Sequence, residues 1–206
     1  RAELSSPQLS HDIFPLIIDR APFELDSGKY TRPIEAAESN RENASDILHI
    51  LCRVEDKYLP DEFLRRDIYD IARVVLGRYV DYGIMRAQEE YPLVMCGEAD
   101  KNTFFTILDR TLRLNELLAE LLGGHTDFSL YDSIEKLRAA APVNPTFETT
   151  LKNNAENSYC RSYIYENAQY LYVAEMRILF EAVKDSLETG LLDREEVNHQ
   201  CARNRE

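Results

Sequence analysis

A run of more than thirty residues without glycine or proline, from Asn157 to Glu188, constrains the fold of this chain more than any other feature. Apolar side chains recur in it at intervals of three and four residues, which is the period of one face of an α-helix. We expect the face that packs against the core to be formed by Ile164, Ala168, Leu171, Glu175, Ile178 and Ala182. The run therefore predicts one long helix and an all-α fold.

Proline and glycine divide the chain before this run into further segments of helical period. The expected helices are one that ends at Pro60, one from Asp61 to about Tyr91 that Pro92 closes, one over 98–122 that Gly123-Gly124 stops, one over 129–141 and one that begins at Asn144-Pro145. Within the second helix, Gly77 and Gly83 are destabilising unless a close neighbouring helix needs the space. Because short loops between long helices favour antiparallel neighbours, we predict a multi-helix bundle of about six helices, mostly antiparallel.

The two ends of the chain differ from this helical region. Four prolines at near-regular spacing interrupt any long helix at the start, so we expect an irregular lead-in or linker over 1–33. The helical bundle domain should then cover 34–206, with its core at 45–190 and a charged, frayed tail from Asp193 onward. The sequence begins at Arg1 without an initiator methionine or an apolar signal core, which suggests a piece of a longer protein.

Charge and hydropathy exclude two classes of partner. The net charge is −13 and the isoelectric point is about 4.8, whereas binding to a phosphate backbone needs a clustered basic face. No apolar run approaches the ~20 residues that cross a bilayer. We therefore expect no nucleic-acid partner and no membrane partner.

Histidine and cysteine spacing gives little support to a metal site. Asp46 and His49, and likewise Glu196 and His199, have the carboxylate-x-x-histidine spacing of di-metal helical bundles, but such a site needs two further inward carboxylates. A di-metal or cofactor-binding bundle enzyme is thus the least supported class, and we expect no metal and no cofactor.

The four cysteines are widely spaced and form no zinc-type grouping. Cys52 and Cys160 fall inside helical patterns, where a thiol acts as a small apolar filler. For Cys96 and Cys201, as for the other two, the spacing leaves disulfide formation open.

No catalytic set is visible in the sequence. It contains no nucleophile elbow, phosphate-binding loop or dinucleotide fingerprint. Glycosidase chemistry needs two opposed carboxylates, and spacing alone selects no such pair among 37 acidic residues. We therefore assign no catalytic residues to this chain.

A first polar cluster lies near the start of the second expected helix. It consists of Arg65, Asp67, Asp70 and Arg73, whose spacing allows neighbouring members to meet on one helix surface. We favour a structural ion-pair network for these residues over a role in ligand binding.

A second cluster is aromatic and lies in the first half of the glycine-free run. Its members are Tyr159, Tyr163, Tyr165, Tyr170 and Tyr172, and they form two stripes because 163 and 170, like 165 and 172, are seven residues apart. Tyrosine buries a large area and keeps a polar tip, which suits protein interfaces and sugar-binding clefts. These side chains are candidates to face a substrate or a partner, and the alternative is a helix wedged between its neighbours.

Two segments together resemble the C-terminal helical domain of the α-N-acetylglucosaminidases, glycoside hydrolase family 89. The family pattern Arg-x-Asp-Leu-x-Asp-x-x-Arg-Gln is matched at Arg65, Asp67, Ile68, Asp70 and Arg73, with Val74 in place of the glutamine. The second segment is matched at Phe147-Glu148, Asn154-Ala155, Ser158-Tyr159-Cys160, Leu171-Tyr172, Met176-Arg177 and Phe180-Glu181-Ala182. The similarity covers roughly 45–190, although this chain has no tryptophan and the Trp-Gly loop of the family is shortened here.

The resemblance implies a non-catalytic accessory domain that packs on the catalytic barrel of a glycoside hydrolase, which this chain lacks. In that family the catalytic carboxylates belong to the barrel, and the helical domain can line the sugar cleft, so a carbohydrate is a possible ligand. A secreted, periplasmic or lysosomal location would follow. The alternative is a free-standing helical interaction module that binds a protein through its tyrosine-rich face.

Overall fold

The computed structural model describes residues 34–140, 145–156 and 164–205, and all regular elements within them are helices. The α-helices are α2 (Ile34–Leu51), α3 (Glu62–Met95), α4 (Lys101–Gly123), α5 (Leu130–Ala140), α6 (Pro145–Glu156), α7 (Val173–Thr189) and α8 (Arg194–Arg205). Two 3₁₀ turns, η1 (Asp56–Tyr58) and η2 (Thr126–Phe128), and one π-helical segment, η3 (Asn167–Tyr172), complete the described elements. The predicted all-α class is confirmed, whereas the expected lead-in over 1–33 lies outside the described residues.

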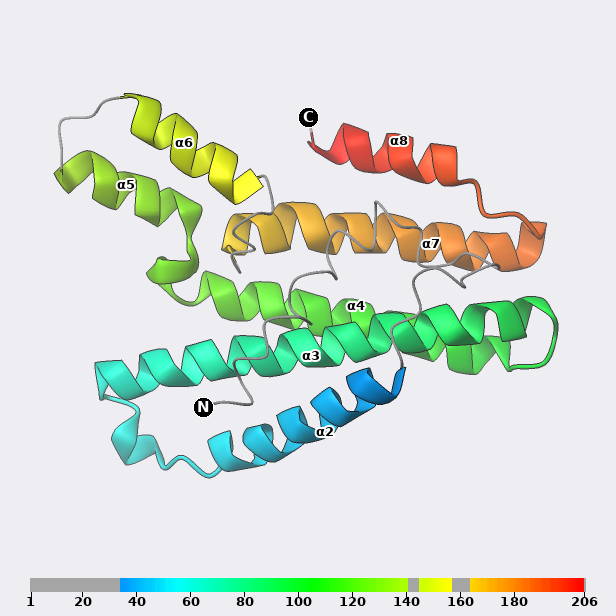
Figure 1. Cartoon of the computed structure of the whole chain (residues 1–206), viewed down its shortest axis with the longest axis horizontal. Coiled ribbons are helices and arrows are strands. Elements are labelled where there is room, and N and C mark those ends of the chain that lie inside the picture. Colours follow the sequence, from blue (N-terminus) through cyan, green and yellow to red (C-terminus); the bar gives the residue numbers. More distant parts are fainter. Residues whose placement is uncertain (1–33, 141–144, 157–163, 206) are drawn as a thin grey trace.

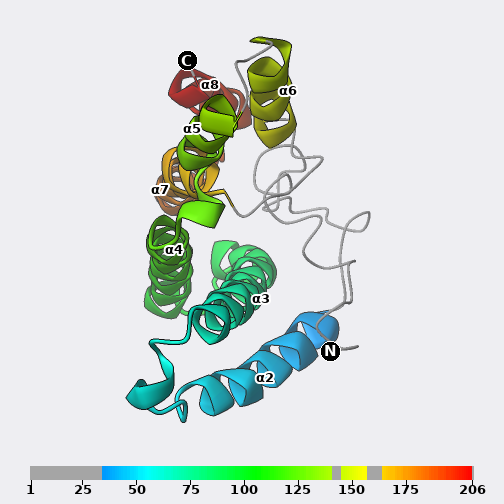
Figure 2. The same ribbon diagram turned by 90° about the vertical axis from the view of Figure 1, so that its left-hand side faces the viewer.

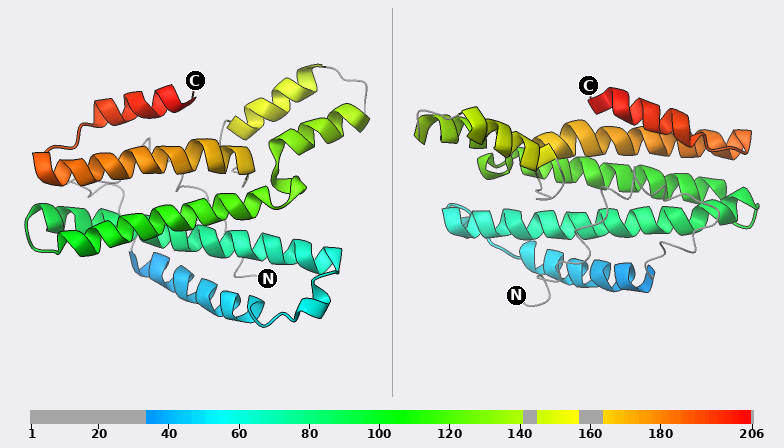
Figure 3. Two further views of the ribbon diagram at one scale, coloured as in Figure 1. Left: turned by 180° about the vertical axis from the view of Figure 1, so that it is seen from behind. Right: turned by 45° about the horizontal axis from the view of Figure 1, so that its top comes forward.

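Five helices lie side by side in the order α2, α3, α4, α7 and α8, each antiparallel to the next (Figures 1 and 3). The long α3 and α4 form the central hairpin, with α2 along the outer side of α3 and α7 along α4. The short helices α5 and α6 form a hairpin beyond the C-terminal end of α4 (Figures 1 and 2). None of the described helices is long and apolar enough to span a bilayer.

The core forms where α3, α4 and α7 face one another. Its larger cluster contains Val80, Ile84, Ala87, Tyr91, Phe104, Leu108, Met176, Leu179, Phe180 and Val183. A smaller cluster near the start of α5 contains Leu118, Ala119, Leu122, Phe128, Ala168 and Val173. Burial of each large apolar side chain contributes roughly 1.5–3 kcal/mol, so these clusters account for the helix order better than helix propensity does.

Gly83 allows α3 and α4 to approach closely. A Cβ atom placed on Gly83 would lie 2.2 Å from Oγ1 of Thr111, whose hydroxyl donates a hydrogen bond to the carbonyl of Ile107 at 2.7 Å. Gly83 is buried, and α4 occupies the space that a side chain at this position would need.

Two predicted boundaries around α3 are wrong. The helix before it ends at Leu51, and the expected last turn at Tyr58 is instead the separate 3₁₀ turn η1. Pro92 does not close α3, which continues to Met95. A proline this close to the end removes only one helical hydrogen bond, and the Pro92 carbonyl still accepts one from the Cys96 amide at 3.0 Å.

The glycine-free run is helical from residue 165, but it is not one regular α-helix. The π-helical segment η3 holds about one residue more per turn than an α-helix, so it rotates the side chains that follow it. The core side of α7 consequently contains Val173, Met176, Leu179, Phe180 and Val183. Of the six expected core positions, only Ala168 and Glu175 are buried. Gly190, at φ 76° in the left-handed region, ends α7.

The C-terminal residues form a packed helix, so the prediction of a frayed tail is wrong. The Asp193 side chain accepts a hydrogen bond from the Glu196 amide at 3.0 Å, which caps the start of α8. Val197 packs against the larger core cluster, and Cys201 is buried. The prediction relied on the charged composition of this segment. It did not take account of Val197 and Cys201, which are four residues apart and share one helix face.

Candidate functional site

Three segments far apart in the sequence meet at the end of the bundle where α3 begins. They are the first turns of α3, the stretch from the end of α4 to the start of α5, and the π-helical segment with the two residues before it. The rings gathered there are Tyr69, His125, Phe128, Tyr131, Tyr165 and Tyr170. We call these six residues the aromatic end.

Rings on α3 and η2 pack closely within the aromatic end. The centroid of Tyr69 lies 5.3 Å from that of His125 and 6.5 Å from that of Phe128. The Tyr69 hydroxyl donates a hydrogen bond to the Gly124 carbonyl at 3.3 Å, and His125 Nδ1 accepts one from the Asp127 amide at 3.2 Å. These contacts hold η2 against the start of α3.

The glycine pair at the end of α4 makes room for two tyrosines. A Cβ atom on Gly123 would lie 2.9 Å from Cε2 of Tyr165, and one on Gly124 would lie 2.7 Å from the hydroxyl of Tyr69. Gly124 has φ −78°, so it ends the helix without the left-handed conformation that usually requires glycine. Close approach of side chains therefore accounts for this pair better than backbone conformation does.

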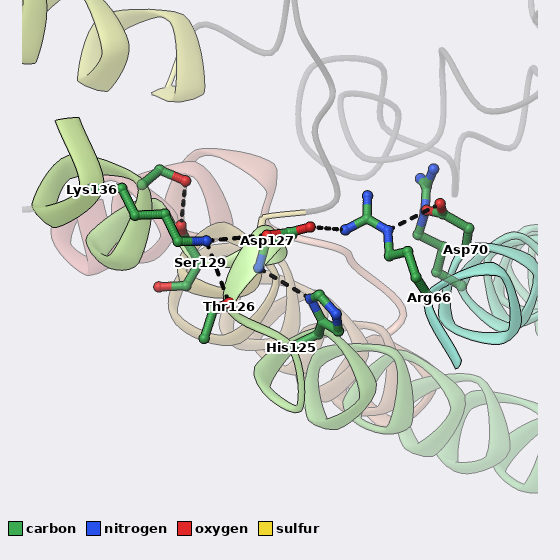
Figure 4. Close-up of polar contacts among 9 residues, drawn as sticks. Arg66, Asp70, His125, Thr126, Asp127, Ser129 and Lys136 are labelled. Carbon is green, nitrogen blue, oxygen red and sulfur yellow. Dashed lines mark hydrogen bonds and ion pairs between the residues drawn. The ribbon is translucent and has the colours of Figure 1, made fainter. Parts of the chain in front are cut away.

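A chain of alternating charges crosses the same region (Figure 4). Asp70 accepts hydrogen bonds from Nε of Arg73 at 2.9 Å and from Nε of Arg66 at 3.3 Å. Arg66 also pairs through Nη1 with Asp127, and Lys136 Nζ lies 3.1 Å from the other oxygen of that carboxylate. The guanidinium carbons of Arg66 and Arg73 lie over the ring of Phe128, 4.8 and 5.7 Å from its centroid. The chain thus joins α3, η2 and α5.

The two carboxylates in this chain have lowered pKa values. Burial raises the pKa of Asp70, but the hydrogen bonds and charges of Arg73 and Arg66 outweigh burial and lower it overall. The pKa of Asp127 is lowered mainly by its hydrogen bond with Lys136, and the charge of Arg66 adds to this effect. Both groups are therefore ionised at neutral pH and act as fixed negative links in the chain.

Of the predicted ion-pair cluster, the structure brings together Asp70 and Arg73. Arg65 and Asp67 are exposed, and within the described part of the chain no ion pair includes either of them. Arg66, which the sequence analysis missed, takes the central position instead. It is four residues from Asp70, so the helical i,i+4 rule would have found that pair. The pairing with Asp127, 61 residues away, has no such local signal.

Glu166 fixes the start of α5 to the π-helical segment. Its carboxylate accepts hydrogen bonds from the Ser129 hydroxyl and the Leu130 amide, both at 2.8 Å, and from the Tyr131 amide at 3.0 Å. Burial raises the pKa of Glu166, but the hydrogen bonds from the Tyr131 and Leu130 amides and the Ser129 hydroxyl contribute to an overall lowering of that pKa. A carboxylate at this position compensates the unpaired amides and the positive dipole of a helix N-terminus. The sequence analysis did not identify it, because its partners lie more than thirty residues away.

The predicted tyrosines are distributed differently from the two expected stripes. Tyr159 and Tyr163 lie outside the described residues. Tyr165 contacts Tyr170 edge to face, with ring centroids 6.1 Å apart, and Tyr172 is partly buried against the smaller core cluster. The pKa of the Tyr165 phenol is raised, first by its hydrogen bond with Tyr170.

Three of the large exposed hydrophobic side chains lie on the segments that meet here. Phe63 lies in the first turn of α3, Tyr131 lies at the start of α5 and Tyr170 lies in η3. The other large exposed hydrophobic residues described are Leu48, Ile50, Tyr58, Leu59, Leu93, Phe147 and Leu191.

The polar groups described at this end hold the structure together. Asp70, Asp127 and Glu166 are each engaged in the contacts given above. Among the described residues, no group of three histidine, cysteine, aspartate or glutamate side chains could hold a metal ion.

Cys52 lies beyond the end of α2 and is exposed, so it is not the apolar filler that the sequence predicts.

Comparison with known proteins gives no relative for this chain: no family model, no curated protein and no solved structure matches it.

Proposed function

We propose that this chain is a non-catalytic helical module that docks on a partner protein, and that the partner is the catalytic barrel of a glycoside hydrolase. The observation behind the proposal is that three exposed aromatic side chains, Phe63, Tyr131 and Tyr170, lie on the segments that meet where α3 begins. Apolar side chains scattered singly over a surface are normal, whereas a concentration of them marks an interaction site.

The composition of this end suits a protein interface. Exposed tyrosine, phenylalanine and arginine are the residue types enriched where proteins bind one another. Phe63 is 86% exposed, and Tyr131 and Tyr170 are 66% and 63% exposed. The charge chain and Glu166 hold the backbone beneath these rings in place, which reduces the entropy that binding would lose.

The glycoside hydrolase part of the proposal rests on the residue resemblance alone. The segments that carry the resemblance, 65–73 and 147–182, both contribute to this end of the bundle. An accessory domain that faces a barrel through this end would bring Tyr131 and Tyr170 near its neighbour. A carbohydrate contact and a secreted, periplasmic or lysosomal location belong to the same proposal.

A free-standing interaction module is the second candidate, because the same exposed aromatic side chains would serve any protein partner. The two candidates differ in what the parent gene encodes before Arg1. A barrel-length region upstream supports the accessory domain, and an initiator methionine directly before Arg1 contradicts it.

The enzymatic part of the proposal is tested with these 206 residues on an aryl N-acetyl-α-glucosaminide. We expect no turnover, and hydrolysis by this chain alone would overturn the non-catalytic assignment.

The docking part is tested by expressing the upstream region separately and measuring its binding to this chain. We expect Phe63→Ala and Tyr170→Ala each to weaken binding by about 10-fold or more, as interface aromatic residues commonly do. Leu191→Ala, at the opposite end and 72% exposed, is the matched control and should have no effect. Equal effects of all three substitutions, or no binding at all, would contradict docking on that region.

A further inference from the structure

We propose that α5 and α6 form an arm that can undock from the bundle as a unit, and that Glu166 is the latch that holds it. The two helices pack against each other at the edge of the molecule, outside the row formed by α2, α3, α4, α7 and α8 (Figures 1 and 2). The principal neighbours of α5 are η2 and α6, and the principal neighbour of α6 is α5.

Little apolar surface ties the arm to the bundle. Ile134 is the one buried residue of α5, and none of the side chains described in α6, residues 146–153, is buried. Elements with few buried apolar contacts open locally at a much lower free energy than the whole domain unfolds. We therefore expect the arm to separate at a lower free energy than the core of α3, α4 and α7 unfolds.

Polar contacts within the arm keep its two helices together. Arg138 donates hydrogen bonds to both oxygens of Glu148, at 2.7 and 3.1 Å, so the guanidinium and the carboxylate meet in a two-pronged contact between α5 and α6. Such paired bonds give more geometric definition than a single contact does. We therefore expect the two helices to move together.

The latch and the pivot are separate groups. Glu166 accepts three hydrogen bonds from residues 129–131, and undocking breaks all three, together with the contacts of Lys136 with Thr126 and Asp127 on η2. The turn η2 stays with the bundle, because Arg66 and Tyr69 on α3 hold it through Asp127 and His125. The pivot is therefore Ser129, whose backbone is extended at φ −94° and ψ 126°.

The latch also sets the position of an exposed ring. Tyr131 lies on the arm and Tyr170 lies on the π-helical segment, so the Glu166 contact with the Tyr131 amide places both tyrosines at one end of the molecule. This consequence for binding rests on the proposed function, whereas the undocking itself is a property of the free chain and is tested without a partner.

The test is hydrogen exchange of the full chain, read by peptide mass spectrometry, for the parent protein and Glu166→Gln. A glutamine amide cannot accept the bond that the Leu130 amide donates to the second carboxylate oxygen. Removal of a charge-assisted bond predicts roughly 10-fold faster exchange over 130–140 and 145–156 together, with α3 and α4 unchanged. Glu181→Gln, an exposed carboxylate on α7, is the control and should change neither region.

Three results would overturn the proposal. These are unchanged exchange in Glu166→Gln, faster exchange in α5 without α6, and an equal increase in α3 and α4. Should Glu166→Gln fail to fold, Ser129→Ala removes one of the three bonds, and with it the cap that the Ser129 hydroxyl provides for the Asp132 amide, and should give faster exchange over the same two ranges. Unchanged exchange in Ser129→Ala would then count against the latch. Because no partner is present, these outcomes are independent of whether the docking proposal holds.

Discussion

Tyr165 and Tyr170 contact each other edge to face with ring centroids 6.1 Å apart, although they are five positions apart in the sequence. In a regular α-helix, residues three or four apart are the neighbours. The π-helical segment η3, which begins at Asn167, brings residues five apart onto the same side. The contact is thus a direct consequence of the local helix type.

Tyr170→Phe should lower the pKa of the Tyr165 phenol toward its ordinary value. The hydrogen bond with Tyr170 is the largest cause of the raised pKa of Tyr165, and phenylalanine cannot form it. The measurement is an NMR titration of ring-labelled tyrosine. Tyr58→Phe, at an exposed position on η1, is the control and should leave the Tyr165 titration unchanged.

Gly83→Ala should destabilise the chain by about 1–3 kcal/mol, the usual cost of overpacking a core. The added methyl group would lie 2.2 Å from the Thr111 hydroxyl oxygen, and the side chain of Thr111 is buried. Urea unfolding of both single variants and of the double variant with Thr111→Ala measures the effect. We expect the double variant to recover much of the loss, and purely additive effects would show that the two helices do not meet here.

Acidification should destabilise the aromatic end before the central core. Asp70, Asp127 and Glu166 have folded-state pKa values below their ordinary values of 3.8, 3.8 and 4.5. Each group thus stabilises the fold above its ordinary pKa, and this contribution is lost as the pH falls through the lower folded value. Thermal unfolding between pH 7 and pH 2.5 measures the loss.

The matched variant for this pH dependence is Asp70→Asn. Because Asp70 is partly exposed, we expect the substitution to cost about 1 kcal/mol or less at pH 7. It should also reduce the slope of stability against pH below about pH 4, since one titrating group is removed. An unchanged slope would show that the arginine contacts of Asp70 do not persist in solution.

The thiol of Cys201 should react slowly with a thiol reagent, because Cys201 lies on the buried face of α8. Asp193→Ala removes the side chain that caps α8, which should reduce the stability of this helix by about 1 kcal/mol. Because the thiol then becomes accessible more often through local opening, we expect roughly 5-fold faster labelling. The experiment uses a background in which the other three cysteines are serine. Asn198→Ala, on an exposed position of α8, is the control, and equal rates in both variants would contradict the capping role of Asp193.

Helical periodicity in the sequence was sufficient for the class of fold and for most element positions. The observed α4, Lys101–Gly123, and α5, Leu130–Ala140, lie within three residues of their predicted limits. Such predictions succeed because a helix buries a stripe of side chains whose spacing is set by its own geometry. Glycine and proline also mark most ends correctly, with Pro60 and Pro92 as the exceptions.

The candidate site followed from the sequence only in part. Asp70 and Arg73 are three residues apart on one helix, so their pairing could be expected from local spacing. Arg66–Asp127 and Glu166–Leu130 join residues 61 and 36 positions apart, and no local rule selects one such pair from many charged residues.

Local spacing therefore accounts for the helices, their antiparallel order and the polar contacts within one helix. The meeting of Glu166 with residues 129–131, the placement of Arg66 and the Tyr165–Tyr170 contact depend on how α3, α4 and α7 pack and on the π-helical segment between residues 167 and 172. Sequence periodicity does not contain this information, because one extra residue in a helical turn changes which side chains face the core. Long-range contacts are then set by the shape of the packed helices.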